Sequence, residues 1–70
     1  MSLKVTSRVS ALLGERKKRV SDVARDTGIS RTTLTRLYYG DSRAISFETL
    51  GKLCDYFHCD VGDILVCEED

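Results

Sequence analysis

The sequence predicts an all-α fold, a compact bundle of five short helices. Three observations favour this fold class. Apolar residues recur at every third or fourth position, which is the spacing of one helix face. Helix-capping residues such as Ser30 and Ser46 precede these segments, and glycines such as Gly28 and Gly40 follow them. Finally, no alternating β-branched run is bounded by the turn residues that close a β-hairpin.

Size and composition predict one domain over residues 1–70, with its core at about 5–65 and a short acidic C-terminal tail at 66–70. With 41% hydrophobic and 31% charged residues, the chain is not of the disordered class. It has neither an apolar run long enough to cross a membrane nor a secretory signal, so we expect a cytoplasmic location. Its three cysteines form no CxxC pair, which indicates thiols rather than a disulfide framework.

The first predicted helix is amphipathic, because its apolar residues lie on one face. These residues are Val5, Val9, Leu12 and Leu13. Thr6 or Ser7 is suited to cap its start, and the basic run at 16–19 suits the negative end of its dipole. A second helix is predicted from about residue 20 to 27, with Gly28 in the position that permits a left-handed end.

The third predicted helix begins at the N-cap Ser30, continues through residue 39 and stops at Gly40. After a loop at 41–45, Ser46 caps a fourth helix and Glu48 lies in its first turn. The apolar face of this fourth helix comprises Phe47, Leu50, Leu53, Cys54 and Phe57. Asp60 caps a short fifth helix over 61–65.

A net charge of zero conceals an asymmetry along the chain. Residues 1–43 hold ten basic side chains and four acidic ones, a net charge of +6. Residues 44–70 hold one basic side chain and seven acidic ones, a net charge of −6. A protein of this kind can present a basic face to phosphate while its other end repels phosphate.

The second and third helices have the residues that a helix-turn-helix unit requires. Ala24 is small where the next helix must pass closely, and Gly28 supplies the turn. Four apolar residues would lock the two helices together: Val23, Ile29, Leu34 and Leu37. The spacing therefore predicts a helix-turn-helix at the centre of the bundle.

If Leu34 and Leu37 define the buried side of the third helix, its other side is arginine, threonine and tyrosine. No acid lies between residues 30 and 39. Arginine can donate two hydrogen bonds to guanine, and threonine offers a hydroxyl and a methyl group that suits thymine. This composition favours base reading over a merely solvated surface, for which Glu and Lys are the usual residues.

Three segments resemble the phage Cro/repressor (XRE-type) helix-turn-helix DNA-binding family. They read VSDVARDTGISRTTLTRLYYG at 20–40, SFETLGKLC at 46–54 and CDVGDIL at 59–65. The resemblance implies a lambda repressor-like DNA-binding domain and a sequence-specific transcriptional regulator, a repressor rather than an activator. It further implies a homodimer that places its 30–39 helices in successive major grooves of an operator-like duplex, with half-sites about 34 Å apart.

The resemblance also assigns roles to individual side chains. The expected base-reading residues are Arg31, Thr32, Thr35 and Arg36. The expected phosphate contacts are Arg19, Ser21, Ser30, Thr33, Tyr39 and Arg43. Two positions depart from the family pattern. Arg19 and Val20 replace the usual Ser or Thr cap and the glutamine that clamps a phosphate, and Thr27 replaces a residue that is commonly apolar.

Other function classes fit the residues less well. Catalysis would require an orienting group and a cleft beside His58, so we do not expect an enzyme. A zinc site at Cys54, His58 and Cys59 lacks the second close ligand pair, and we expect neither metal, cofactor nor small-molecule ligand. The remaining alternative is a helix-turn-helix module that binds protein, such as an antitoxin or a partner-binding regulator, because a fold does not fix its function.

Overall fold

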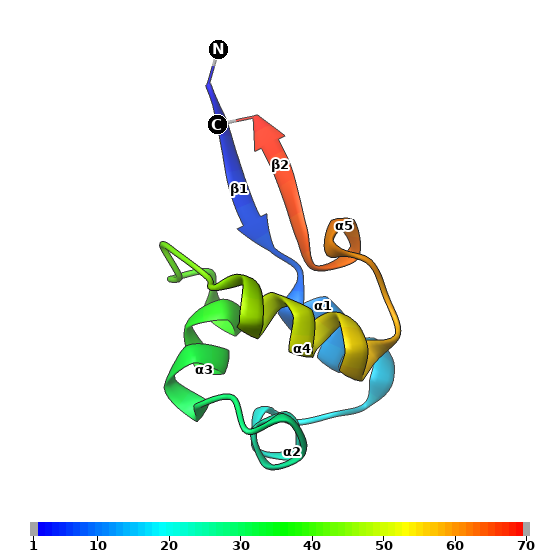
Figure 1. Ribbon diagram of the computed structural model, residues 1–70. Coiled ribbons are helices and arrows are strands. Elements are labelled where there is room, and N and C mark those ends of the chain that lie inside the picture. Colours follow the sequence, from blue (N-terminus) through cyan, green and yellow to red (C-terminus); the bar gives the residue numbers. More distant parts are fainter. Residues whose placement is uncertain (1, 70) are drawn as a thin grey trace.

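A computed structural model describes residues 2–69, which contain five helices between two short strands (Figure 1). The elements in chain order are β1 (Leu3–Ser7), α1 (Val9–Arg16), α2 (Val20–Thr27), α3 (Arg31–Tyr39), α4 (Phe47–Phe57), α5 (Val61–Ile64) and β2 (Leu65–Glu69). The five predicted helices are confirmed. None of the helices between residues 2 and 69 is both long and apolar enough to cross a membrane.

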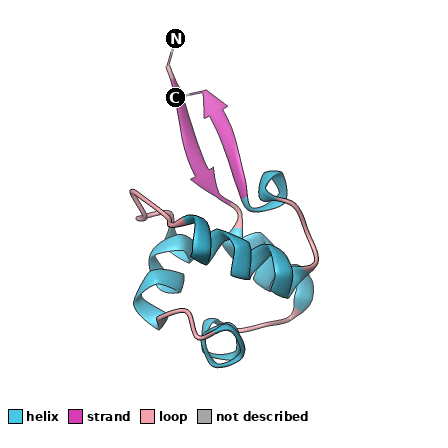
Figure 2. Ribbon diagram, in the orientation of Figure 1, coloured by secondary structure: helices cyan, strands magenta, loops and turns pink. Residues whose placement is uncertain are grey.

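The purely α-helical prediction is wrong, because β1 and β2 form a two-stranded antiparallel sheet (Figure 2). The register runs from Leu3 opposite Glu69 to Ser7 opposite Leu65. Residues 66–69, predicted to be part of a tail, therefore belong to a strand, and Asp70 lies outside the described residues. No short turn joins the strands, since the whole helical body separates them in sequence, and hairpin signals cannot reveal such a pairing.

The sheet also shifts the start of the first helix. α1 begins at Val9, and Val5 lies in β1 with 64% of its surface exposed instead of in the core. Of the two candidate caps, Ser7 makes a capping-type bond: its hydroxyl accepts a hydrogen bond of 3.1 Å from the backbone N–H of Val9. Extended pairing of residues 3–7 with β2 thus replaces the first helical turn that periodicity predicts.

The core lies among the five helices, and the eleven side chains that are buried within residues 2–69 are all apolar. They are Val9, Leu12, Leu13, Val23, Ile29, Leu34, Leu37, Leu50, Leu53, Phe57 and Ile64. Phe47, predicted to belong to the buried face of α4, is instead 91% exposed. Phe47 is the first residue of α4, and Ile45 of the preceding loop packs against the core.

The α2–α3 unit has the predicted turn geometry. Gly28 ends α2 with a φ of 78°, and Gly40 ends α3 with a φ of 75°, both in the left-handed region that favours glycine. Ala24 is partly buried against the core, and α2 and α3 pack on each other. Residues 20–40 therefore form the two-helix unit that the sequence predicts.

Thr27 has a structural role at the end of α2. Its hydroxyl donates a hydrogen bond of 2.6 Å to the carbonyl oxygen of Val23. The hydroxyl oxygen of Thr27 in turn accepts a hydrogen bond of 3.2 Å from the backbone N–H of Ile29. A threonine in this commonly apolar position therefore joins the last turn of α2 to the first residue beyond Gly28.

Replacing Thr27 with valine tests this bridge. The shape is nearly conserved, but the N–H of Ile29 loses its partner beside a buried side chain. We expect Thr27→Val to lower the free energy of unfolding by about 1–3 kcal/mol, measured by chemical denaturation. Thr27→Ser keeps the hydroxyl and should retain most of the stability; equal stability of the valine variant and the parent would contradict the role assigned to Thr27.

Candidate nucleic-acid interface

The packing of α3 decides which of its side chains face solvent. Leu34 is 1% exposed and Leu37 is 2% exposed, so this side of α3 is fixed against the core. Both α1 and α2 contact α3. The four expected base-reading residues are exposed: Arg31, Thr32, Thr35 and Arg36. None of the arginines of α3 forms an ion pair with another residue between 2 and 69.

Ser30 and Thr33 bond to each other at the start of α3. The hydroxyl of Ser30 accepts a hydrogen bond of 3.1 Å from the backbone N–H of Thr33, which is the N-cap interaction that the sequence predicts. It also donates a bond of 2.8 Å to the hydroxyl of Thr33. This mutual bonding gives both residues a structural role at the helix start.

A shallow groove between α3 and the end of the α1–α2 connection gathers several predicted site residues. Arg19, Arg31, Thr35 and Tyr39 all contribute to its lining, together with Lys18 and Tyr38. The rings of Tyr38 and Tyr39 meet edge to face, with their centroids 5.0 Å apart. The depression beside α3 therefore gathers three basic side chains, one from α3 and two from the α1–α2 connection, and two phenol rings of α3.

Arg36 and Arg43 lie at a second hollow, beside the loop that follows α3. Asp41, Ser42 and Ala44 complete its lining. The fold thus separates the expected contacts into two groups, one on each side of the exposed surface of α3. Ser21 and Thr32 are exposed but line neither depression.

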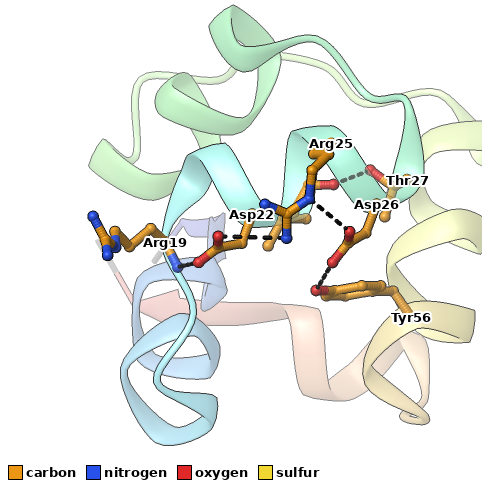
Figure 3. Close-up of polar contacts among 7 residues, drawn as sticks. Arg19, Asp22, Arg25, Asp26, Thr27 and Tyr56 are labelled. Carbon is orange, nitrogen blue, oxygen red and sulfur yellow. Dashed lines mark hydrogen bonds and ion pairs between the residues drawn. The ribbon is translucent and has the colours of Figure 1, made fainter.

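The start of α2 is stabilised by an acid rather than by the usual Ser or Thr cap. The backbone N–H of Arg19 donates a hydrogen bond of 2.9 Å to the carboxylate of Asp22, and Val20 follows as the first helical residue. In Figure 3 the guanidinium of Arg19 points away from the other labelled side chains. The cap therefore uses the backbone of Arg19 and leaves its charged group available to solvent.

A chain of polar contacts connects α2 with α4 (Figure 3). Arg25 lies 3.6 Å from a carboxylate oxygen of Asp22 and donates a bond of 3.1 Å to Asp26. The hydroxyl of Tyr56, on α4, donates a bond of 2.8 Å to the second carboxylate oxygen of Asp26. Both acids of α2 thus contact Arg25, and Asp26 also accepts a hydrogen bond from Tyr56 of α4.

This network shifts the titration of its members. The hydrogen bond from Tyr56, followed by that from Arg25, lowers the pKa of Asp26 below its usual value. The same bond to Asp26 raises the pKa of Tyr56, because deprotonation would destroy the donor beside a carboxylate. Asp26 also raises the pKa of Arg25. Asp26 is therefore ionised, and Tyr56 protonated, at neutral pH.

Two polar side chains that line the groove, those of Lys18 and Tyr38, were not among the expected contacts. Tyr38 lies seven positions after Arg31 and three after Thr35, so helical periodicity alone places it on their side of α3. Lys18 precedes α2 in an irregular segment, where no period assigns a direction to a side chain. Its ammonium also lies 5.9 Å from the ring centroid of Tyr56.

The three residues considered as possible zinc ligands lie at the end of α4 and just beyond it. His58 adopts a left-handed φ of 54° as the C-cap, and Cys54 and Cys59 are partly buried. Burial raises the pKa of the Cys59 thiol. Across residues 2–69, no three His, Cys, Asp or Glu side chains are grouped as metal ligands.

Comparisons with known proteins concern the chain as a whole. The family model for the Cro/C1-type HTH DNA-binding domain matches residues 8–70. The chain is 32% identical over 62 residues to the uncharacterized HTH-type transcriptional regulator YozG of Bacillus subtilis, an alignment that covers 89% of this chain and 74% of that protein.

Two crystal structures share the fold. A Bacteroides fragilis protein has a TM-score of 0.77 and 21% identity, and the match covers 90% of this chain and 100% of that one. The transcriptional regulator VanUg has a TM-score of 0.76 and 24% identity, and the match covers 100% of this chain and 92% of that one. At these identities, both likenesses concern the fold alone.

The link between α2 and α4 is testable through its pH dependence. We expect Tyr56→Phe to lower the free energy of unfolding at neutral pH, because Asp26 loses a donor. A carboxyl whose folded pKa is lowered stabilises the protein above its unfolded pKa of about 3.9 and loses this effect as the pH falls through the folded value. The difference between the two proteins should therefore shrink below about pH 4. Denaturation curves recorded from neutral to acidic pH measure it, and a difference independent of pH would argue against the bond.

Proposed function

Because the chain belongs to the Cro/C1-type helix-turn-helix DNA-binding family, we propose that it regulates transcription by reading one duplex sequence with α3 in the major groove. The observation that carries this proposal is the outward surface of α3. Arginines and threonines cover it, no acid interrupts it, and the buried Leu34 and Leu37 fix its direction.

Arg31, Thr32, Thr35 and Arg36 are the proposed base readers. An arginine that lacks an ion pair keeps its five N–H donors for a ligand, and two of them match O6 and N7 of guanine. Arg31 and Arg36 meet this condition within residues 2–69. The threonines between them are small enough to let the helix approach base edges closely.

The proposed phosphate contacts lie on both sides of the reading surface. Arg19 and Tyr39 line the groove toward α2, whereas Arg43 lies at the hollow beyond α3. Ser21, Ser30 and Thr33, at the starts of α2 and α3, add short hydroxyls. Contacts on both sides suit a helix lying in the major groove, because a phosphate backbone borders each edge of that groove.

The charge distribution supports this orientation. The six excess positive charges of residues 1–43 accompany α1 to α3, and the six excess negative charges of residues 44–70 accompany α4, α5 and β2. A duplex attracts the first part and repels the second, so the field favours approach with α3 foremost. Affinity should accordingly fall as salt rises.

A homodimer on a two-fold, operator-like site completes the proposal, since a helix as short as α3 reads few base pairs. Occupying such a site would block a promoter, so we propose repression. The proposal involves neither a cofactor nor a small-molecule ligand, and the place of action is the cytoplasm. A role in binding protein instead of DNA is the competing outcome of the experiments below.

The first experiment selects bound duplexes from a random library and then measures affinity for the selected site. We expect Arg31→Ala and Arg36→Ala each to weaken binding by about 1–3 kcal/mol, roughly 5- to 150-fold, and to relax the preference at one base pair. Lys52→Ala removes the same charge from α4 and should leave affinity nearly unchanged. If no sequence is enriched, or if the arginine variants bind as the parent does, protein binding becomes the better interpretation.

The second experiment separates phosphate contacts from base contacts. We expect Arg43→Ala to weaken all duplexes to a similar extent and to lower the slope of log affinity against log salt by about one. Binding at several salt concentrations, to the selected site and to a scrambled one, gives both quantities. An effect of Arg43→Ala on the selected site alone would contradict the phosphate contact assigned to Arg43.

A further inference from the structure

The β1–β2 ribbon projects from one end of the helical body (Figure 1), and the pair Leu3 and Glu69 lies at its far tip. Its base is attached to the body: the backbone N–H of Arg8 donates a bond of 2.7 Å to the carbonyl oxygen of Ile64, and Leu65 packs against the core. A two-stranded ribbon without further covering is marginally stable in water. We therefore expect a further contact, beyond those at its base, to stabilise the ribbon.

The two faces of the ribbon differ in character. Residues directly opposite in an antiparallel pair share a face, and faces alternate along each strand. One face carries Leu3, Val5, Ser7, Leu65, Cys67 and Glu69, and the other carries Lys4, Thr6, Val66 and Glu68. On the first face Leu3 is 68% exposed and Val5 is 64% exposed. Neighbouring apolar side chains that remain exposed can mark a surface at which another molecule binds.

The apolar face continues onto the helical body. Val5, Ser7 and Leu65 of this face, with Thr6 beside them, line a small cavity together with residues of α3 and of the α3–α4 loop. The residues on that side include Leu37, Arg43, Ala44 and Ile45. Ribbon and body thus form one continuous surface, apolar along the ribbon and basic where Arg43 meets its base.

We propose that a second copy of this chain covers this face. The two ribbons pack face to face and antiparallel, about a two-fold axis that passes beside their central pair, Val5 and Cys67. Val5 then lies over Val5 of the second copy, and Cys67 over Cys67. This inference rests on the proposed function, because a two-fold DNA site requires a two-fold protein.

The dimensions of the molecule fit this arrangement. Five strand residues span about 17 Å, which leaves about 22 Å of the 39 Å long axis for the helical body. Ribbons that overlap along their whole length then place the centres of the two bodies about 39 Å apart. This separation is close to the 34–36 Å between successive major grooves on one side of a duplex.

The charges also match. The tip of the ribbon carries Glu69 on the apolar face, and the base of that face is bordered by Arg43. In an antiparallel overlap each tip meets the other copy's base, which brings acid toward arginine at both ends. A parallel overlap would place Glu69 beside its own counterpart, and like charges in such a position repel.

The test measures association without DNA. We expect the parent chain to sediment as a dimer and the double variant Leu3→Glu, Val5→Glu to weaken the dimer about 100-fold or more, because it would bury charges without partners. Val61→Glu alters an apolar residue of α5 that is 50% exposed and should leave the dimer intact. Circular dichroism checks that the helices persist. A monomeric parent, or a dimer that the double variant does not weaken, would overturn the proposal.

A second measurement needs no change in the ribbon's apolar residues. Cys67 is exposed, so a short reagent with two thiol-reactive groups should join two parent chains, and Cys67→Ser should abolish the product. If the chain sediments as a dimer but gives no Cys67-dependent product, the contact lies elsewhere and the inference is wrong. Failure here is distinguishable from failure of the proposed function: a ribbon variant should still bind a single half-site, and Arg31→Ala should remain dimeric.

Discussion

Burial of Leu34 and Leu37 is the constraint on which the rest of the structure depends. These side chains fix the rotation of α3 against α1 and α2, and they thereby determine which side of α3 is exposed to solvent. A helix as short as α3 is not stable alone, and packing must hold it. The same contacts that complete the core therefore also aim Arg31 and Arg36 away from the protein.

The support of α2 comes from polar contacts at its two ends. Asp22 accepts the backbone N–H of Arg19 at the first turn, and the hydroxyl of Thr27 joins the last turn to Ile29. Tyr56 then links α2 to α4 through Asp26. These bonds engage both acids of α2, and the arginines of α3 have no ion-pair partner among residues 2–69.

The sequence predicts those parts of the fold that neighbouring residues determine. Ser30 caps α3 as expected, Gly28 and Gly40 end their helices, and Leu34 and Leu37 are buried, because each depends on positions within a turn or two. The pairing of β1 with β2 depends on residues at opposite ends of the chain and has no local signal. The exposure of Phe47 escapes periodicity for a related reason, since spacing defines a face but not how far the neighbouring elements cover it. In the candidate site, helical periodicity predicts which side chains of α3 are exposed. Lys18 lies in an irregular segment, and only the assembled fold determines where its side chain lies.

The residues of α3 that pack against the core and those proposed to contact DNA are almost entirely different. Leu34 and Leu37 pack α3 against the core, whereas the exposed side chains of Arg31, Thr35 and Arg36 form no hydrogen bond or ion pair with another residue between 2 and 69. Exposed side chains away from caps and cores typically change stability by less than about 0.5 kcal/mol when substituted. A regulator built in this way can acquire a different base preference through exposed positions while its core stays the same. Ser30 and Thr33 are the exception, because their hydroxyls stabilise the helix start and also lie beside the proposed path of the phosphates.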